Sequence, residues 1–151
     1  MELLVGHASP RNAERIAEIE KQCFSVPVTA EQMSRMIVDN IYDVITVTYD
    51  GVVAGYGCMS CILDEGSIYN IAVDPEFRRS GIGTAVMQAL DEDAQQRGLS
   101  FLTLEVRESN LPAIALYKKM GYSESGKIKN YYSNPKETAV IYTKRFKETL
   151  N

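Results

Sequence analysis

Residues 70–84 of this 151-residue chain read NIAVDPEFRRSGIGT, an apolar run followed by a glycine-containing loop and the start of a helix. Gly81 and Gly83 lack side chains, so a ligand can approach the backbone there. The following helix offers free N–H groups and the positive end of its dipole, and Arg78 and Arg79 add positive charge. The stretch therefore predicts a strand, a phosphate-binding loop and a helix, and with them a phosphorylated cofactor.

The helix after this loop has one apolar side and one polar side. Its apolar residues recur at helical spacing, and Gly98 supplies a left-handed end. The apolar residues are Ile82, Ala85, Val86, Ala89 and Leu90.

Two other interpretations of the loop are open. An isolated R-x-x-G-x-G is common in tight turns with solvated arginines. The loop also resembles the dinucleotide fingerprint G-x-G-x-x-G, and Glu105 lies near the distance expected of a ribose-binding acid. However, Val86 occupies the third glycine position, and the segment from Asp74 to Ser80 is longer than the turn of that fold. A nicotinamide cofactor is therefore disfavoured.

Composition indicates an ordinary globular protein. The chain is 45% hydrophobic and 24% charged, which suits a single domain over residues 1–151. The start, MELLVGH, resembles neither a signal peptide nor a membrane span, so we expect a cytoplasmic location. The net charge of −4 argues against binding to nucleic acid or an anionic membrane, and mildly favours a cationic acceptor.

The cysteines and the one histidine predict no metal site and no disulfide framework. Cys58 and Cys61 form a C-x-x-C pattern, but they lie in a predicted strand, where positions i and i+3 point to opposite faces. Cys23 and His7 are the remaining soft ligands, and they do not complete a zinc set. We expect buried structural cysteines, and no histidine-dependent catalytic triad.

The remaining pattern predicts alternating strands and helices. Asp50-Gly51 is a strong hairpin signal, and Thr29 with Gln32 forms a capping box. Ser109 or Asn110 is placed to cap a later helix. Strands are predicted over 2–8, 42–49, 52–62, 67–73, 101–106, 122–132 and 139–146, and helices over 10–24, from 29, from 82 and over 112–120. This order predicts an α+β fold with a largely antiparallel sheet and a local parallel pair.

Several blocks of sequence share their order and spacing with one known family. They are residues 69–84, LEVRESN at 104–110, AIALY at 113–117, Gly121-Tyr122 and Tyr131-Tyr132. Together they resemble the GNAT superfamily of acetyl-CoA-dependent N-acetyltransferases. Within it, the pattern is most similar to the bacterial ribosomal-protein alanine N-acetyltransferases.

The resemblance implies a twisted, mixed sheet flanked by helices, with a splayed central parallel strand pair. It also implies acetyl-CoA as cosubstrate. Backbone groups of Ile71, Ala72 and Val73 would pair with the pantetheine arm, Asn110 would contact the cofactor, and an N–H near Val73 would polarise the thioester. The pyrophosphate would be held by the loop residues Arg78, Arg79, Ser80, Gly81, Ile82, Gly83 and Thr84.

The resemblance assigns Glu105 as general base, directly or through water, and Tyr117 as general acid. Glu105 interrupts the apolar strand of Leu104 and Val106, where we expect burial to make it a useful base. A tyrosine, with an ordinary pKa of about 10, is a plausible proton donor to a thiolate whose conjugate acid has a pKa of about 8.5. Alternatively, Glu105 pairs with Arg107 or a neighbouring lysine on a half-exposed strand face, and Tyr117 is a core aromatic with a solvent-exposed hydroxyl.

The acceptor implied by the family is a protein N-terminal α-amino group, with a ribosomal protein favoured. Tyr131 and Tyr132 would bind the incoming peptide, unless strand alternation makes one of them core and the other surface. Relatives usually carry Pro-Trp after Cys-Phe, whereas this chain has Pro27-Val28 and no tryptophan. A small-amine acetyltransferase and an acyl-CoA-binding sensor without turnover therefore remain as alternatives.

Overall fold

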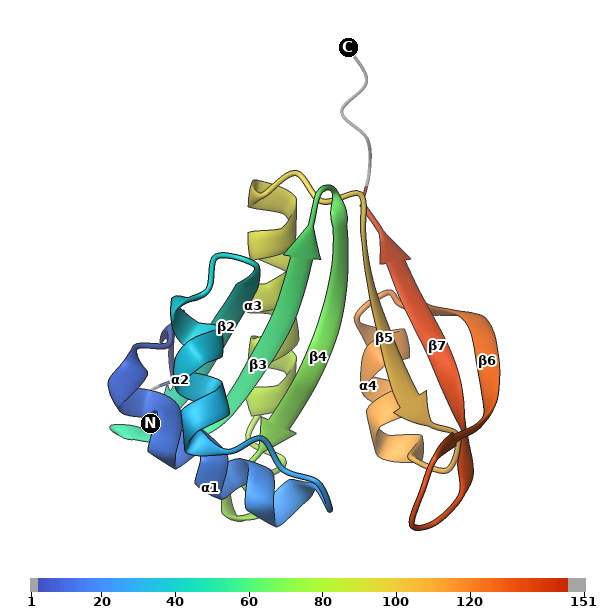
Figure 1. Ribbon diagram of the computed structural model, residues 1–151. Coiled ribbons are helices and arrows are strands. Elements are labelled where there is room, and N and C mark those ends of the chain that lie inside the picture. Colours follow the sequence, from blue (N-terminus) through green and yellow to red (C-terminus); the bar gives the residue numbers. More distant parts are fainter. Residues whose placement is uncertain (1–2, 147–151) are drawn as a thin grey trace.

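The computed structural model describes residues 3–146, and within them seven strands form one sheet in the order β1-β2-β3-β4-β5-β7-β6 (Figure 1). Neighbouring strands are antiparallel except for β4 and β5, which are parallel. The mixed sheet predicted from the sequence is confirmed. The strands are β1 (Leu3–His7), β2 (Tyr42–Tyr49), β3 (Val52–Ile62), β4 (Glu65–Val73), β5 (Phe101–Arg107), β6 (Ser123–Tyr132) and β7 (Glu137–Arg145).

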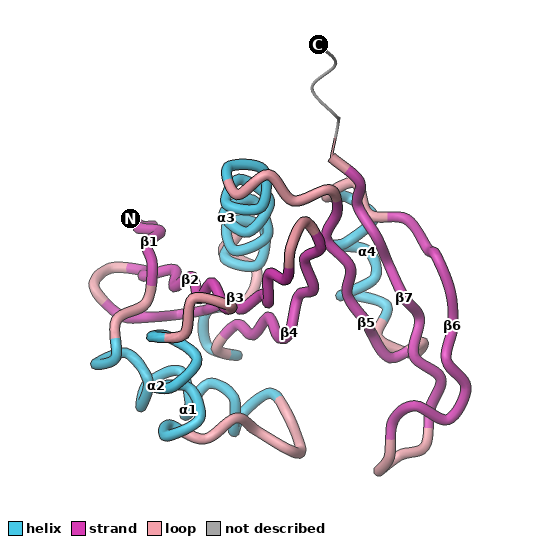
Figure 2. The backbone as a smooth tube through the Cα atoms, turned by 45° about the horizontal axis from the view of Figure 1, so that its top comes forward, coloured by secondary structure: helices cyan, strands magenta, loops and turns pink. Residues whose placement is uncertain are grey.

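Four α-helices cover the two faces of the sheet, as the turned view shows (Figure 2). The helices α1 (Ala13–Cys23) and α2 (Ala30–Val38) pack on one face, and α3 (Ile82–Gln96) and α4 (Leu111–Lys119) pack on the other. Two short 3₁₀ turns, η1 (Pro10–Asn12) and η2 (Pro75–Phe77), precede α1 and follow β4. None of the helices in residues 3–146 is long and apolar enough to cross a membrane.

Local sequence signals explain where these elements begin and end. Asp50 and Gly51 both have positive φ, 48° and 86°, as expected of a hairpin turn whose twist matches its strands. The Thr29 hydroxyl accepts the Gln32 N–H, and the Gln32 side chain accepts the Thr29 N–H, so the predicted capping box is confirmed. Gly98 and Gly121 have φ of 76° and 95° at the ends of α3 and α4.

Each face of the sheet has its own apolar core. Leu102, Leu104 and Val106 of β5 are buried on the α3 and α4 face, whereas Tyr56 and Cys58 of β3 are buried under α1 and α2. Alternation along β3 brings Cys61 to the α3 face, opposite to Cys58, and the cysteines are free thiols. The predicted opposite faces of Cys58 and Cys61 are confirmed, but only Cys58 is buried, and Cys23 and Cys61 are partly exposed.

Candidate active site

The parallel strands β4 and β5 are paired at one end and separate along the rest of their length (Figure 1). Their ladder consists of Glu65–Ser67 against Phe101–Thr103. At the closed end, a Cβ on Gly66 would lie 2.6 Å from Leu102 Cδ2, so glycine permits the close approach of the strands there. The predicted splay of the parallel pair is therefore present.

The splay leaves a backbone edge of β4 facing the opening. The Asp74 N–H donates to the Ala54 carbonyl of β3, and alternation along the strand turns the backbone groups of Val73 and Ile71 the other way, toward β5. The Cys23 thiol donates to the Val73 carbonyl at 3.4 Å, from the opening side. Ala72 differs from the other two predicted residues, because its backbone groups point to β3.

The loop between β4 and α3 is anchored at its first residue. The buried Asp74 carboxylate accepts hydrogen bonds from the Arg15 guanidinium at 2.6 Å and from the Glu76 N–H at 2.9 Å. Burial raises the pKa of Asp74, but these two donors outweigh it, and the pKa lies below its usual value. Arg78, which reaches the Cys23 sulfur at 3.6 Å, and Arg79 are exposed beyond this anchor.

The two loop glycines have different roles in the structure. Gly81 has φ of 78°, precedes the first residue of α3, and has no atom within 4 Å of the place where a Cβ would lie. It therefore leaves open space before the helix N-terminus. A Cβ on Gly83 would lie 3.3 Å from Leu116 Cδ2, so glycine at this position is required mainly by the contact between α3 and α4. The Ile82 side chain is buried in the core, so of this residue only the backbone N–H at the start of α3 could contact a ligand.

A cavity of about 660 Å³ opens between β4 and β5. It is lined by β4, β5, α4, the end of β6 and the segment after α1, so it brings together residues from distant parts of the chain. The predicted site residues in its lining are Ile71, Glu105, Asn110, Tyr117, Tyr131 and Tyr132. The loop residues 78–84 and Ala72 and Val73 are outside this lining.

Glu105 lies on the open face of β5. Leu104 and Val106 are buried on the opposite face, whereas Glu105 is exposed, so the expected burial of this carboxylate is wrong. Side chains of a strand point above and below the sheet, so burial of Glu105 requires a helix on its face, and the helices α1 and α2 pack over β2, β3 and β4 instead. The Tyr131 hydroxyl donates to the Glu105 carboxylate at 3.4 Å. Arg107 pairs with Glu137 at 3.2 Å, which contradicts the alternative that it pairs with Glu105.

Tyr117 is half-buried on α4 and lines the cavity while packing against the core. Burial raises the pKa of its hydroxyl to about 12, so it holds its proton at neutral pH. Asn110 caps the same helix, accepting the Ala113 N–H at 3.3 Å. A wall of the cavity is therefore a capped helix that carries a protonated hydroxyl.

Tyr131 and Tyr132 both line the cavity, with their rings 5.0 Å apart and nearly perpendicular. Strict alternation would have placed them on opposite faces, but the β6–β7 register shifts between Ile128 and Tyr132, and Asn130 has φ of 56°. The Arg107 guanidinium lies 4.5 Å from the Tyr132 ring centre, and burial raises the pKa of Tyr132 to about 12.

Sequence reasoning missed an anchor beneath the cavity. Glu20 of α1 is fully buried, and its carboxylate accepts the Tyr56 hydroxyl, the Asn70 amide at 3.0 Å and the Val28 N–H at 2.8 Å. Asn70 and Val28 line the cavity. Glu20 thus ties the segment after α1 to β4. The sequence contains little signal for this role, because a glutamate in an amphipathic helix normally marks the exposed side of that helix.

Comparisons with known proteins agree with this geometry. The sequence model of the acetyltransferase (GNAT) family matches residues 13–122. The Escherichia coli ribosomal protein bS18-alanine N-acetyltransferase is 40% identical over 97 residues, which cover 63% of this chain and 66%, just under two thirds, of that enzyme. A Bacillus subtilis protein, named as a putative enzyme of the same kind, is 35% identical over 129 residues, 85% of each chain.

Solved structures show the same fold. The crystal structure of the Escherichia coli bS18-alanine N-acetyltransferase superimposes with a TM-score of 0.90 at 29% identity, covering 98% of this chain and 96% of that one. The Ard1 structure from Thermoplasma volcanium has a TM-score of 0.88 at 26% identity, covering 98% of this chain and 100% of that one. With the family match over residues 13–122, these similarities establish that the chain belongs to the GNAT family of acetyltransferases.

Proposed function

We propose that this chain transfers the acetyl group of acetyl-CoA to the N-terminal alanine of ribosomal protein bS18. The reaction class, acyl transfer from acetyl-CoA, follows from membership of the family. The acceptor is inferred from the names of the Escherichia coli and Bacillus subtilis relatives. The observation that carries the proposal is the cavity, because a carboxylate, a protonated hydroxyl and two tyrosines meet there beside the open edge of β4.

The residues present fit acetyl-CoA. Val73 and Ile71 direct backbone groups into the opening, and the amides of a pantetheine arm are suited to pair with them as another strand would. The loop before α3 has open space at Gly81 and a helix N-terminus without a side-chain cap, which suits a pyrophosphate. Arg78 and Arg79 would add charge, and Asn110 would contact the cosubstrate from the α4 side.

In the reaction, the nitrogen lone pair of the acceptor amine attacks the thioester carbonyl carbon. A C–N bond forms, the carbonyl oxygen becomes an oxyanion, and the amine loses a proton to Glu105 directly or through water. The exposed position of Glu105 suits this role, because the carboxylate reaches water and an incoming amine. The Val73 N–H, which faces the opening, would stabilise the oxyanion.

The tetrahedral intermediate then collapses. The C–S bond breaks, the acetamide is released, and CoA leaves as a thiolate that takes a proton from Tyr117. Burial raises the pKa of Tyr117 to about 12, so the hydroxyl carries its proton when the intermediate forms. A tyrosinate is a stronger base than a free thiolate, so the proton moves to sulfur as the C–S bond breaks, and bulk water then returns a proton to Tyr117.

The acceptor peptide would enter from the side of Tyr131 and Tyr132. Their perpendicular rings offer an apolar surface for the first side chain, and their hydroxyls are suited to bind peptide carbonyls. Val26 and Val28, from the segment after α1, line the cavity across from them. Val28 stands where relatives usually carry tryptophan, and its smaller side chain would leave space for the acceptor.

The test is mass spectrometry after incubation with acetyl-CoA and a panel of acceptors. The panel contains a peptide copying the first residues of bS18, the same peptide with a blocked N-terminus, and free alanine and a polyamine. We expect a gain of one acetyl group on the unblocked peptide, located at its N-terminal nitrogen, and none on the blocked control.

Two results would contradict the proposal. Faster acetylation of the polyamine or free alanine than of the peptide would favour the small-amine alternative. Tight binding of acetyl-CoA with no acceptor modified would favour the sensor.

A further inference from the structure

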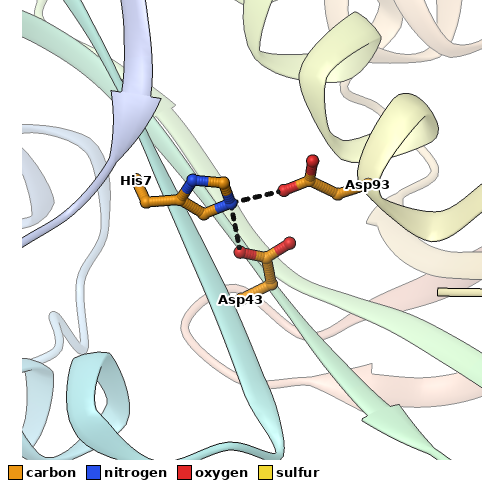
Figure 3. Close-up of side chains that lie close together, drawn as sticks. All are labelled: His7, Asp43 and Asp93. Carbon is orange, nitrogen blue, oxygen red and sulfur yellow. Dashed lines mark hydrogen bonds and ion pairs between the residues drawn. The ribbon is translucent and has the colours of Figure 1, made fainter. Parts of the chain in front are cut away.

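Away from the cavity, one histidine and two carboxylates from three elements lie close together (Figure 3). His7 is the last residue of β1, Asp43 lies on β2, and Asp93 lies on α3. The His7 Nε2 atom is 2.8 Å from Asp93 Oδ2 and 3.3 Å from Asp43 Oδ1, and one ligand atom from each residue lies within 4.8 Å of the others. None of the three lines the acetyl-transfer cavity.

Asp43 supplies a second, independent observation. Its side chain is 3% exposed, and Oδ2 has no hydrogen-bond partner among the residues that the structure describes. The Arg97 Nε lies 3.9 Å away, close enough for an ion pair but too far for a hydrogen bond. Figure 3 shows this oxygen on the side of the Asp93 carboxylate. A buried carboxylate oxygen that faces another carboxylate is destabilised unless a shared proton or a cation lies between them.

The spacing of the three ligand atoms suits a small cation. A tetrahedral zinc site with bonds of about 2.0–2.2 Å holds its ligand atoms about 3.3–3.5 Å apart. His7 and Asp43 already have this separation, at 3.3 Å. His7 and Asp93 are closer, at 2.8 Å, so Asp93 must withdraw by about half an ångström. Rotation of one partly exposed side chain provides that movement.

We propose that His7, Asp43 and Asp93 form a binding site for a divalent transition-metal ion of the zinc type. One imidazole nitrogen with two carboxylate oxygens favours zinc over magnesium or calcium, which prefer six or more oxygen ligands. The His7 side chain is 69% exposed, so the ion has a path from solvent and water completes its coordination.

The neighbouring groups set the charge of the site. The two carboxylates and the Arg97 guanidinium give a net charge of −1 when His7 is neutral, so a divalent ion is attracted. Cys61 also faces Arg97, and burial raises the pKa of its thiol. The ion would link β1 to α3. Among the described strands, β1 pairs only with β2, so this link would add a second attachment for β1.

The site is tested by titrating zinc into protein freed of metal by a chelator. Calorimetry is expected to show one ion per chain with micromolar or tighter affinity. At a zinc concentration 100 times the dissociation constant, the melting temperature is expected to rise by about 5–10 °C, and the chelator is expected to reverse the rise. Magnesium at the same concentration is expected to produce no such shift.

Variants assign the ligands. His7→Ala and Asp93→Asn are each expected to weaken zinc binding at least tenfold, because each removes one of three ligands. Glu92→Gln, on the exposed face of the same helix, is the matched control and is expected to bind zinc like the wild type. Both ligand variants change residues with solvent access, so the fold is expected to survive, and circular dichroism verifies this.

Three results would overturn the proposal. The first is the absence of zinc binding at about 100 μM zinc, together with a melting temperature that depends on pH but not on zinc. This result would mean that a protonated His7, and not a metal ion, bridges the two carboxylates. The second is unchanged zinc binding in the His7→Ala and Asp93→Asn variants. The third is loss of zinc binding in Cys61→Ser with binding retained in His7→Ala and Asp93→Asn, which would place the ion at the neighbouring thiol.

Discussion

The buried carboxylate of Glu20 offers the sharpest test of how the cavity is held in shape. Three donors converge on it: the Tyr56 hydroxyl, the Asn70 amide and the Val28 N–H. Hydrogen bonds to a charged group contribute about 1.5–3 kcal/mol each, against about 0.5–1.5 kcal/mol for neutral ones. Burial, followed by the Glu20 charge, raises the pKa of Tyr56, so its hydroxyl remains a donor.

Glu20→Gln preserves the shape of the side chain, removes its charge and turns one of its two acceptor oxygens into an NH2 donor, to which the Tyr56 hydroxyl can respond by accepting. Three bonds weakened by about 1 kcal/mol each would cost about 3 kcal/mol. Relief of the desolvation of a buried charge offsets part of this cost, which leaves about 2 kcal/mol. For a protein of this size, the melting temperature should fall by about 4–8 °C. Glu20→Ala leaves the three donors unpaired and opens a cavity, so its cost should reach about 4–5 kcal/mol.

The same substitution should affect the acceptor more than the cosubstrate. Without a firm bond to the Val28 N–H, the segment after α1 should loosen, and the peptide KM should rise several-fold while the acetyl-CoA KM changes little. Urea unfolding and steady-state kinetics measure the two effects. Glu18→Gln, on the exposed side of α1, is the control and should lie within about 0.5 kcal/mol of wild type. Wild-type stability and an unchanged peptide KM in Glu20→Gln would refute the reasoning.

Three further predictions concern the proposed reaction. Tyr117→Phe should lower kcat by about 10²–10⁴-fold and leave acetyl-CoA affinity unchanged, and equal rates in the two proteins would remove Tyr117 from the mechanism. Because the pKa of Tyr117 is about 12, kcat of the wild type should show no alkaline decline below about pH 10. Glu105→Gln should reduce kcat/KM most at low pH, where the acceptor is mainly ammonium, and a pH-independent effect would contradict its role as base. Gly81→Val should weaken acetyl-CoA binding at least tenfold in calorimetry, because φ of 78° disfavours a β-branched residue and the side chain would fill open space, whereas unchanged affinity would place the pyrophosphate elsewhere.

Features encoded by adjacent residues could be predicted from the sequence. The hairpin at Asp50-Gly51, the capping box at Thr29 and the helix end at Gly98 each depend on one or two side chains and on the backbone angles that those residues permit. The amphipathic pattern of α3 likewise identified Ile82, Val86, Ala89 and Leu90 as buried, but Asp91, a polar residue of the same helix, is buried as well. These signals are local, so no knowledge of the tertiary structure was needed.

Features that depend on how distant strands meet could not be predicted in this way. Glu105 is exposed because α1 and α2 pack over β2, β3 and β4, and a pattern along β5 alone carries no trace of where those helices lie. Tyr131 and Tyr132 line the same cavity because of an irregularity at Asn130, which alternation cannot foresee. His7 meets Asp43 and Asp93 only after the sheet and α3 have assembled.

The separation of β4 and β5 also explains why an extended, amide-bearing ligand suits this protein. Buried backbone groups need partners, and the edge of β4 at Ile71 and Val73 has lost those that a continuous sheet would provide. The thiol of Cys23 is a weak donor to the Val73 carbonyl and cannot replace a strand. In the proposed function, the amides of a pantetheine arm along this edge would restore the missing hydrogen bonds. The departure from regular strand pairing would then supply the binding edge, and the cavity that opens there holds both Glu105 and Tyr117.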